Sequence, residues 1–112
     1  MAGTRTHTYS HYTRQAIRLL GVLVRTGRLE RRMTARELSE RAGISRDMLY
    51  RIEKGDPRVQ LGAAFEVAAI VGVPLFETEH GLLEARLHAA RDRLALLPGA
   101  VRKSPGKVKD DF

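Results

Sequence analysis

Two short amphipathic runs joined through a single glycine constrain this sequence more than any other feature. They lie in the stretch MTARELSERAGISRDMLYRIEKG, residues 33–55. Thr34 followed by Glu37 is a capping-box signature, so a helix is predicted to begin there. Gly43 can adopt the left-handed conformation that ends this helix, and Ser45 is a suitable N-cap for the next one. The stretch therefore predicts two helices joined by a tight turn.

Apolar spacing divides this helical pair into a core face and an outer face. The positions predicted to share the core are Leu38, Ala42, Ile44, Leu49 and Ile52. The positions left outside, with Met48 at the border, are Arg46, Asp47, Tyr50 and Arg51. A solvated helical hairpin would also be polar outside, so polarity alone identifies no function. The combination of two caps, a glycine and Ile44, an apolar residue that can fill the angle between the two helices, is more specific. It is typical of a helix-turn-helix that points the start of its second helix at base edges.

Charge narrows the possible partners. The chain has 112 residues, with 20 Lys and Arg against 13 Asp and Glu, giving a formal net charge of +7. Such a balance favours a polyanionic partner such as nucleic acid, although a basic surface can also serve solubility alone. There is no Cys, which excludes disulfides, thiol chemistry and Cys-based zinc sites.

The whole sequence predicts an all-α chain of five helices. Beyond the central pair, helices are expected over roughly 12–29, 60–71 and 81–97. The buried stripe of the first of these is predicted to comprise Ile17, Leu20, Val24 and the neighbouring Leu23. The predicted organisation is a flexible arm over 1–9, a helix-turn-helix domain over 10–79, a C-terminal helix over 80–97 and a flexible basic tail over 98–112.

The central stretch resembles the phage-repressor-like (XRE/Cro/cI) family of helix-turn-helix regulators. The resemblance rests on Thr34, Glu37-Leu38, Ala42-Gly43-Ile44-Ser45, Leu49, Ile52-Glu53, Gly55, Phe65, Ala68 and Val73. One departure is Ser39, where the family usually has Ala, and this small change should be tolerated. The resemblance implies a five-helix lambda-repressor-like domain that binds double-stranded operator DNA as a transcriptional regulator.

The same resemblance implies a role for each outer residue. Arg46, Asp47 and Arg51 fall where family members touch bases, and Met48 and Tyr50 lie beside them. An arginine can bind guanine O6 and N7 bidentately, for roughly 1–3 kcal/mol of discrimination. Asp47 could accept a hydrogen bond from a cytosine amino group, or it could only stabilise the helix dipole. Tyr50 could contact DNA or simply cover the helix.

Phosphate contacts are expected from the start of the first helix of the pair, where free backbone N–H groups point outward. The candidates are Thr34, Ala35, Arg36 and, after the second helix, Arg58. Any one of these arginines could instead be a solvated side chain. By resemblance, Arg28 lies opposite Glu53 as a structural ion pair, so both are assigned to the scaffold.

The predicted last helix carries a heptad-like apolar stripe. Its members, spaced four, three, four and three apart, are Leu83, Leu87, Ala90, Leu94 and Leu97. The stripe could close the core of its own chain, or it could pack against a second copy. The second reading, a homodimer, suits paired DNA half-sites about 34 Å apart.

Across its whole length the chain is similar to HipB-type antitoxins, which are paired with HipA-like kinase toxins. That similarity implies a repressor that autoregulates its operon and holds a kinase. The tail could contribute Asp110, Asp111 and Phe112 as a partner-binding peptide, could track phosphates with its basic residues, or could only aid solubility. A stand-alone regulator, or a helical adaptor whose main role is to hold a protein, remains an alternative.

Other chemistry is not indicated by the sequence. His7 and His11 have a helical metal-ligand spacing but no third ligand nearby, so no metal site and no cofactor are expected. No phosphate-binding Gly-rich loop or nucleophile–base pair suggests an enzyme. The longest apolar stretch is too short to span a bilayer, and the N-terminus has no secretory h-region. A cytoplasmic, nucleoid-associated protein is the expectation.

Overall fold

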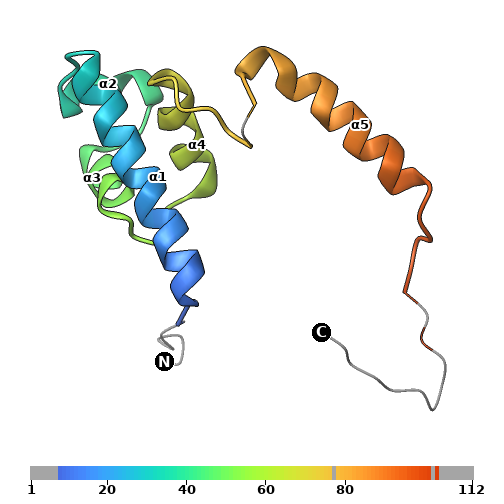
Figure 1. The fold of residues 1–112 in the computed structure, drawn as a ribbon. Helices are drawn as coiled ribbons and strands as arrows, with labels where there is room; N and C mark the ends of the chain where they lie inside the picture. Colours follow the sequence, from blue (N-terminus) through green and yellow to red (C-terminus); the bar gives the residue numbers. More distant parts are fainter. Residues whose placement is uncertain (1–7, 77, 102, 104–112) are drawn as a thin grey trace. The chain divides into compact units, whose positions relative to one another are not determined.

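The computed structural model describes residues 8–76, 78–101 and 103, with His80 described by its backbone alone. Its elements are α1 (His11–Glu30), α2 (Ala35–Ala42), α3 (Arg46–Lys54), α4 (Leu61–Ile70), the 3-10 turn η2 (His80–Leu82) and α5 (Leu83–Ala95) (Figure 1). Within the described ranges the only β-type pairing is an isolated bridge between Leu75 and Thr78. The predicted all-α class is therefore confirmed. The described residues form two compact units, one ending at His80 and the other beginning at Gly81.

Side-chain caps set the starts of the first three helices. The Ser10 hydroxyl accepts the Thr13 N–H at 3.2 Å, and the Ser45 hydroxyl accepts the Met48 N–H at 3.0 Å. At Thr34 the predicted capping box is complete: Thr34 Oγ1 accepts the Glu37 N–H at 3.0 Å, and Glu37 Oε1 accepts the Thr34 N–H at 2.8 Å. Each cap satisfies backbone donors that a helix start leaves unpaired, worth about 1 kcal/mol. These caps explain why the helices begin where the sequence predicts.

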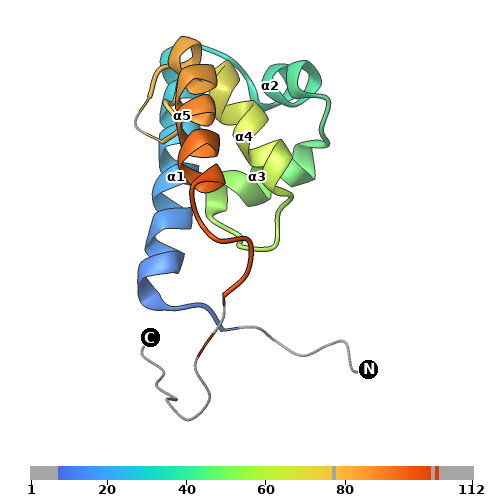
Figure 2. The same cartoon turned by 90° about the vertical axis from the view of Figure 1, so that its right-hand side faces the viewer.

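The core of the first unit lies where α1 packs against α3 and α4, and α2 packs against α3 and α4 in turn. Figure 2 shows α2, α3 and α4 on one side of α1. The largest fully buried side chains are Leu38, Leu49, Val24, Val67 and Val71. The prediction for Leu23 is wrong, because this side chain is 41% exposed. Successive helical residues differ by about 100°, so burying Val24 and Arg28 on one face turns Leu23 outward.

Two glycines let α1 approach its neighbours closely. A Cβ at Gly21 would lie 2.5 Å from the Ile52 carbonyl oxygen and 2.7 Å from that of Glu53. A Cβ at Gly27 would lie 2.8 Å from the Val71 carbonyl oxygen. Because these oxygens belong to the backbone, they cannot move aside as a flexible side chain can. The glycines therefore fix how near α3 and α4 lie to α1.

Gly21→Ala is expected to destabilise the fold by about 1–3 kcal/mol, as overpacking does in a filled core. Gly62→Ala is the matched control, because Gly62 also lies in a helix but its Cβ would meet nothing within 4 Å. The control should be neutral or stabilising by roughly 0.5–1 kcal/mol, since alanine has the higher helix propensity. Urea unfolding of both variants checks the expectation. Equal stabilisation of the two variants would contradict the close approach.

Candidate nucleic-acid interface

The turn between α2 and α3 has the geometry of a helix-turn-helix. Gly43 takes the left-handed conformation, with φ of 72°, and thereby ends α2. The Ile44 N–H returns to the Ser39 carbonyl at 3.0 Å, and the Ile44 side chain packs against the core as the predicted plug. Ser39 is buried but its hydroxyl donates to the Arg36 carbonyl at 3.1 Å, so the polar group costs little. The turn fixes the start of α3 relative to α2.

A buried ion pair attaches α3 to α1. Arg28 Nε donates to Glu53 Oε2 at 2.8 Å, and Arg28 Nη2 donates to Glu53 Oε1 at 3.1 Å. The Arg28 and Glu53 side chains are 9% and 7% exposed. Arg28 Nη1 also donates to the Met33 carbonyl at 3.1 Å, which ties the α1–α2 connection to the same group. Hydrogen bonding to Glu53 raises the pKa of Arg28, so this guanidinium stays charged. The predicted scaffold pair is therefore present.

The outer face of α3 carries a row of exposed polar side chains. Arg46 and Asp47 are exposed in the first turn, and Tyr50 is exposed one turn later. Lys54, which the sequence reading did not single out, lies at the end of this row with its Nζ 5.2 Å from the centre of the Tyr50 ring. Within the part of the chain that the structure describes, the Arg46 side chain has no hydrogen bond or ion pair. Its guanidinium is thus available to an external partner.

Two of the predicted base-contacting residues are only partly exposed: Met48, as its predicted border position implies, and Arg51, which was expected to lie outside. Met48 is half-buried and packs against the core. The Arg51 side chain is 33% exposed, with its Nε 3.6 Å from Asp47 Oδ2 and 3.9 Å from Asp56 Oδ2. Arg51 is therefore held laterally between two carboxylates and does not extend freely outward as Arg46 does.

Asp56 is a second residue that the sequence reading missed. Its carboxylate accepts from Arg58 three times: Oδ1 from the backbone N–H at 2.9 Å and from Nε at 3.1 Å, and Oδ2 from Nη2 at 3.2 Å. The side-chain hydrogen bonds from Arg58 lower the pKa of Asp56, and Asp56 in turn raises the pKa of Arg58. The signal in the sequence was the Asp–Pro–Arg turn, because an aspartate often bonds to the N–H two residues on.

The four phosphate candidates occupy two places at the ends of the helical pair. At the start of α2, the capping box uses the N–H groups of Thr34 and Glu37, so the prediction of a free N–H at Thr34 is wrong. The N–H groups of Ala35 and Arg36 remain without an intrahelical acceptor. The Arg36 side chain is exposed and pairs with Glu40 at 3.2 Å. Beyond α3, the Arg58 side chain is 81% exposed. Free N–H groups and an exposed arginine thus lie at the start of α2, and a second exposed arginine lies after the end of α3.

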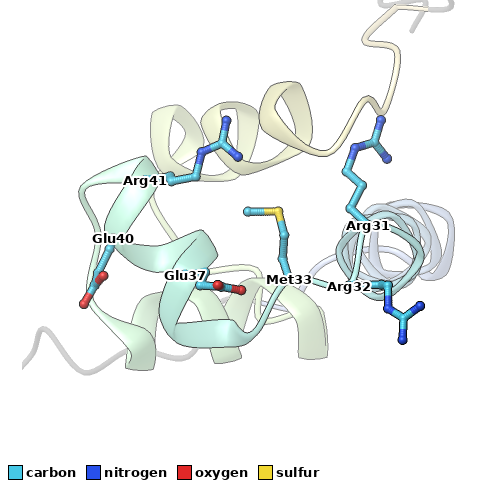
Figure 3. Close-up of a pocket in the computed structure, with 6 residues that line it drawn as sticks. All are labelled: Arg31, Arg32, Met33, Glu37, Glu40 and Arg41. Atoms are coloured by element: carbon cyan, nitrogen blue, oxygen red, sulfur yellow. The ribbon is translucent and has the colours of Figure 1, made fainter.

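A hollow of about 440 Å³ lies at the junction of α1 and α2. It is separate from the row of exposed polar side chains on α3. It is lined by Arg31, Arg32, Met33, Glu37, Glu40 and Arg41 (Figure 3). Arg31 and Arg41 extend on the same side of Met33, whereas Arg32 points away from them. Three positively charged arginines and two negatively charged glutamates surround the space, and the Glu37 side chain already caps α2. The hollow therefore adds positive charge near α2 but gathers none of the predicted base-contacting residues.

The remaining predicted sites lie in the second unit or beyond the described residues. Of the stripe on α5, Leu83 is half-buried and Leu87, Ala90 and Leu94 are exposed, while Leu97 falls just past the end of the helix. Asp110, Asp111, Phe112 and His7 lie outside the described residues.

Among the described residues, no three His, Cys, Asp or Glu side chains gather as a metal site. No helix in the described part of the chain has the length and apolarity to cross a membrane.

Geometry and comparison agree on the class of this domain. A capped helical pair with a left-handed glycine turn, presenting an exposed polar face of its second helix, defines a helix-turn-helix of lambda-repressor-like fold. Residues 24–77 match the family model described as Helix-turn-helix, the XRE-type class of DNA-binding transcription regulators. No curated protein and no solved structure matches the chain.

Proposed function

We propose that this protein is a transcriptional repressor whose α3 reads operator bases in the major groove. The observation that carries the proposal is the exposed face of α3 beginning at Arg46, held in place by the turn at Gly43 and by the buried Arg28–Glu53 pair. The proposed base contacts are Arg46, Asp47, Met48, Tyr50 and Arg51, and the proposed phosphate contacts are Thr34, Ala35, Arg36 and Arg58. A bidentate arginine recognises guanine, an aspartate accepts from cytosine, and helix N–H groups bind phosphate.

Selection of duplexes from a randomised library by the full-length protein tests this proposal. We expect a defined consensus to emerge, with at least a thousandfold preference over random duplex at fixed salt, as is usual for specific regulators. The affinity should fall steeply with salt, by about 0.9 in log–log slope for each phosphate neutralised. Binding with the same affinity to every duplex would reject sequence-specific repression.

We further propose that the protein acts as a homodimer through the stripe on α5. Support comes from the heptad-like spacing, together with the exposure of Leu87 at 49% and Leu94 at 67%. A two-fold dimer would place two copies of α3 on half-sites about one helical turn of DNA apart. The consensus selected by the protein should then be palindromic.

Leu87→Lys/Leu94→Lys is expected to convert a dimer into a monomer, because two charges would enter the apolar contact. Leu96→Lys is the control, since this residue is 85% exposed and lies off the stripe. Sedimentation velocity measures the mass of each variant. An unchanged dimer in the double variant would show that another surface mediates self-association, and a monomeric wild-type protein would reject the dimer.

We also propose that the protein is the antitoxin of a HipA-like kinase toxin, acts on DNA in the cytoplasm and represses its own operon. The support is the similarity of its long first helix, C-terminal helix and basic tail to HipB-type antitoxins. Asp110, Asp111 and Phe112 are the proposed partner-binding residues. An adjacent kinase-like gene whose product copurifies with the full chain, but not with a chain lacking 99–112, would support the pairing. Without such a gene, a stand-alone regulator follows.

A further inference from the structure

One carboxylate, that of Asp56, joins the end of α3 to the loop that follows it. The Asp56 side chain is 13% exposed, whereas the Arg58 side chain that donates to it is 81% exposed. Three hydrogen bonds from Arg58 end on this carboxylate, one from the backbone and two from the guanidinium. Such charge-assisted, two-point contacts fix the plane of a guanidinium as well as its position. Arg58 is therefore a solvent-facing cation with a preset orientation.

The same carboxylate also faces Arg51. Asp56 Oδ2 lies 3.9 Å from Arg51 Nε, and Asp47 Oδ2 lies 3.6 Å from it on the same helix. Arg51 Nε is buried, and no acceptor within the described residues bonds to it. These two distances are longer than a hydrogen bond. The attraction is therefore electrostatic, and it uses none of the hydrogen-bond donors of the Arg51 guanidinium. Asp56 thus restrains Arg51 without consuming its donors.

We propose that Asp56 is a positioning residue for DNA recognition, which aligns Arg58 for a phosphate and Arg51 for a base edge through one shared carboxylate. This inference rests on the proposed reading of operator DNA by α3. The physical reason is preorganisation: a side chain already held in its bound orientation loses less conformational freedom on binding. Because both arginines are anchored to the same group, the phosphate contact would set the register of the base contact.

Asp56→Asn separates positioning from simple charge repulsion, because the two predict opposite results. Asparagine keeps an oxygen that can accept the Arg58 backbone N–H, so the turn should persist, but the negative charge is lost. If Asp56 only repelled DNA, the variant would bind more tightly and with a steeper salt dependence. If Asp56 positions the arginines, preference for the selected duplex over random duplex should fall at least fivefold, the lower end of one bidentate base contact. The log–log salt slope should also become shallower by about 0.9, equal to one phosphate contact.

Glu66→Gln is the charge-matched control, since Glu66 is an exposed residue of α4 and the change removes one negative charge there. Fluorescence anisotropy with full-length protein, at several salt concentrations, measures affinity for the duplex selected by the wild type and for random duplex. The control should keep the wild-type preference. Tighter or unchanged binding by Asp56→Asn, with an unchanged or steeper slope, would overturn the inference.

Arg58→Gln tests the proposed phosphate contact on its own, and an unchanged salt slope in this variant would overturn the inference whether or not Asp56→Asn folds. Arg58 is largely exposed, so its loss should spare the fold and make the salt slope shallower by about 0.9. Adding Asp56→Asn to it should weaken preference further through Arg51 but should not change the slope again. A second equal loss of slope would overturn the shared-carboxylate account. A wild-type protein that selects no duplex would reject the proposed function itself, whereas a selective wild type with unaffected variants rejects only the role of Asp56.

Discussion

Arg28→Ala is expected to lower the free energy of unfolding by about 3–5 kcal/mol, the usual cost of stranding one partner of a buried ion pair. The variant would leave the Glu53 carboxylate, whose side chain is 7% exposed, without its two-point partner. It would also remove the donor to the carbonyl of Met33, a residue in the connection between α1 and α2. Thermal or urea unfolding measures the loss, which is a large share of the stability of a small domain.

Arg25→Ala is the matched control for this pair. Arg25 lies on the same helix, 4.0 Å from Glu53, but its side chain is 61% exposed. Its removal should cost no more than about 1 kcal/mol, because water screens an exposed pair. At a temperature where Arg28→Ala is still folded, its affinity for DNA should remain close to that of the wild type. Equal stability of wild type and Arg28→Ala, or a loss of DNA affinity without a loss of stability, would reject the scaffold role.

Local chemistry explains why the helical pair could be predicted closely. Thr34, Glu37 and Ser45 bond to backbone groups three residues away, and Gly43 acts through its own dihedral angles. Their effect can therefore be predicted from neighbouring residues in the sequence. Apolar spacing likewise placed Leu38 and Leu49 in the core. Interactions over so few residues form in the same way however the rest of the chain packs.

Other features depend on packing between distant segments, which adjacent residues do not encode. Gly21 and Gly27 look like ordinary weak points of a helix, yet the backbone of α3 and α4 presses against them. Arg51 looked like a freely exposed residue because its helical position is polar, but carboxylates on either side of it restrain its guanidinium. The start of α5 at Leu83 was also missed, because the 3-10 turn η2 takes up the two residues where an α-helix was expected to begin.

The Arg46→Ala/Arg51→Ala variant should remove most of the preference for operator over random duplex. Each arginine can supply roughly 1–3 kcal/mol through a bidentate guanine contact, so about 2–6 kcal/mol of discrimination is expected to disappear. Arg46 alone should account for much of this loss, because its side chain is exposed and forms no hydrogen bond or ion pair within the described residues. Fluorescence anisotropy with both duplexes at one salt concentration measures the preference directly.

The loss of two positive charges would by itself weaken binding to any DNA, so preference and affinity must be separated. Arg14→Ala/Arg91→Ala is the control, since both residues are exposed and belong to helices other than α3, namely α1 and α5. Both double variants should bind random duplex less well, because non-specific affinity follows charge. Only the α3 variant should lose preference, because phosphate contacts carry no sequence information. If the α3 variant keeps the wild-type preference at fixed salt, direct readout by Arg46 and Arg51 is wrong, and other residues of the protein must read the sequence. A wild-type protein that binds both duplexes equally would instead favour the helical adaptor with incidental DNA affinity.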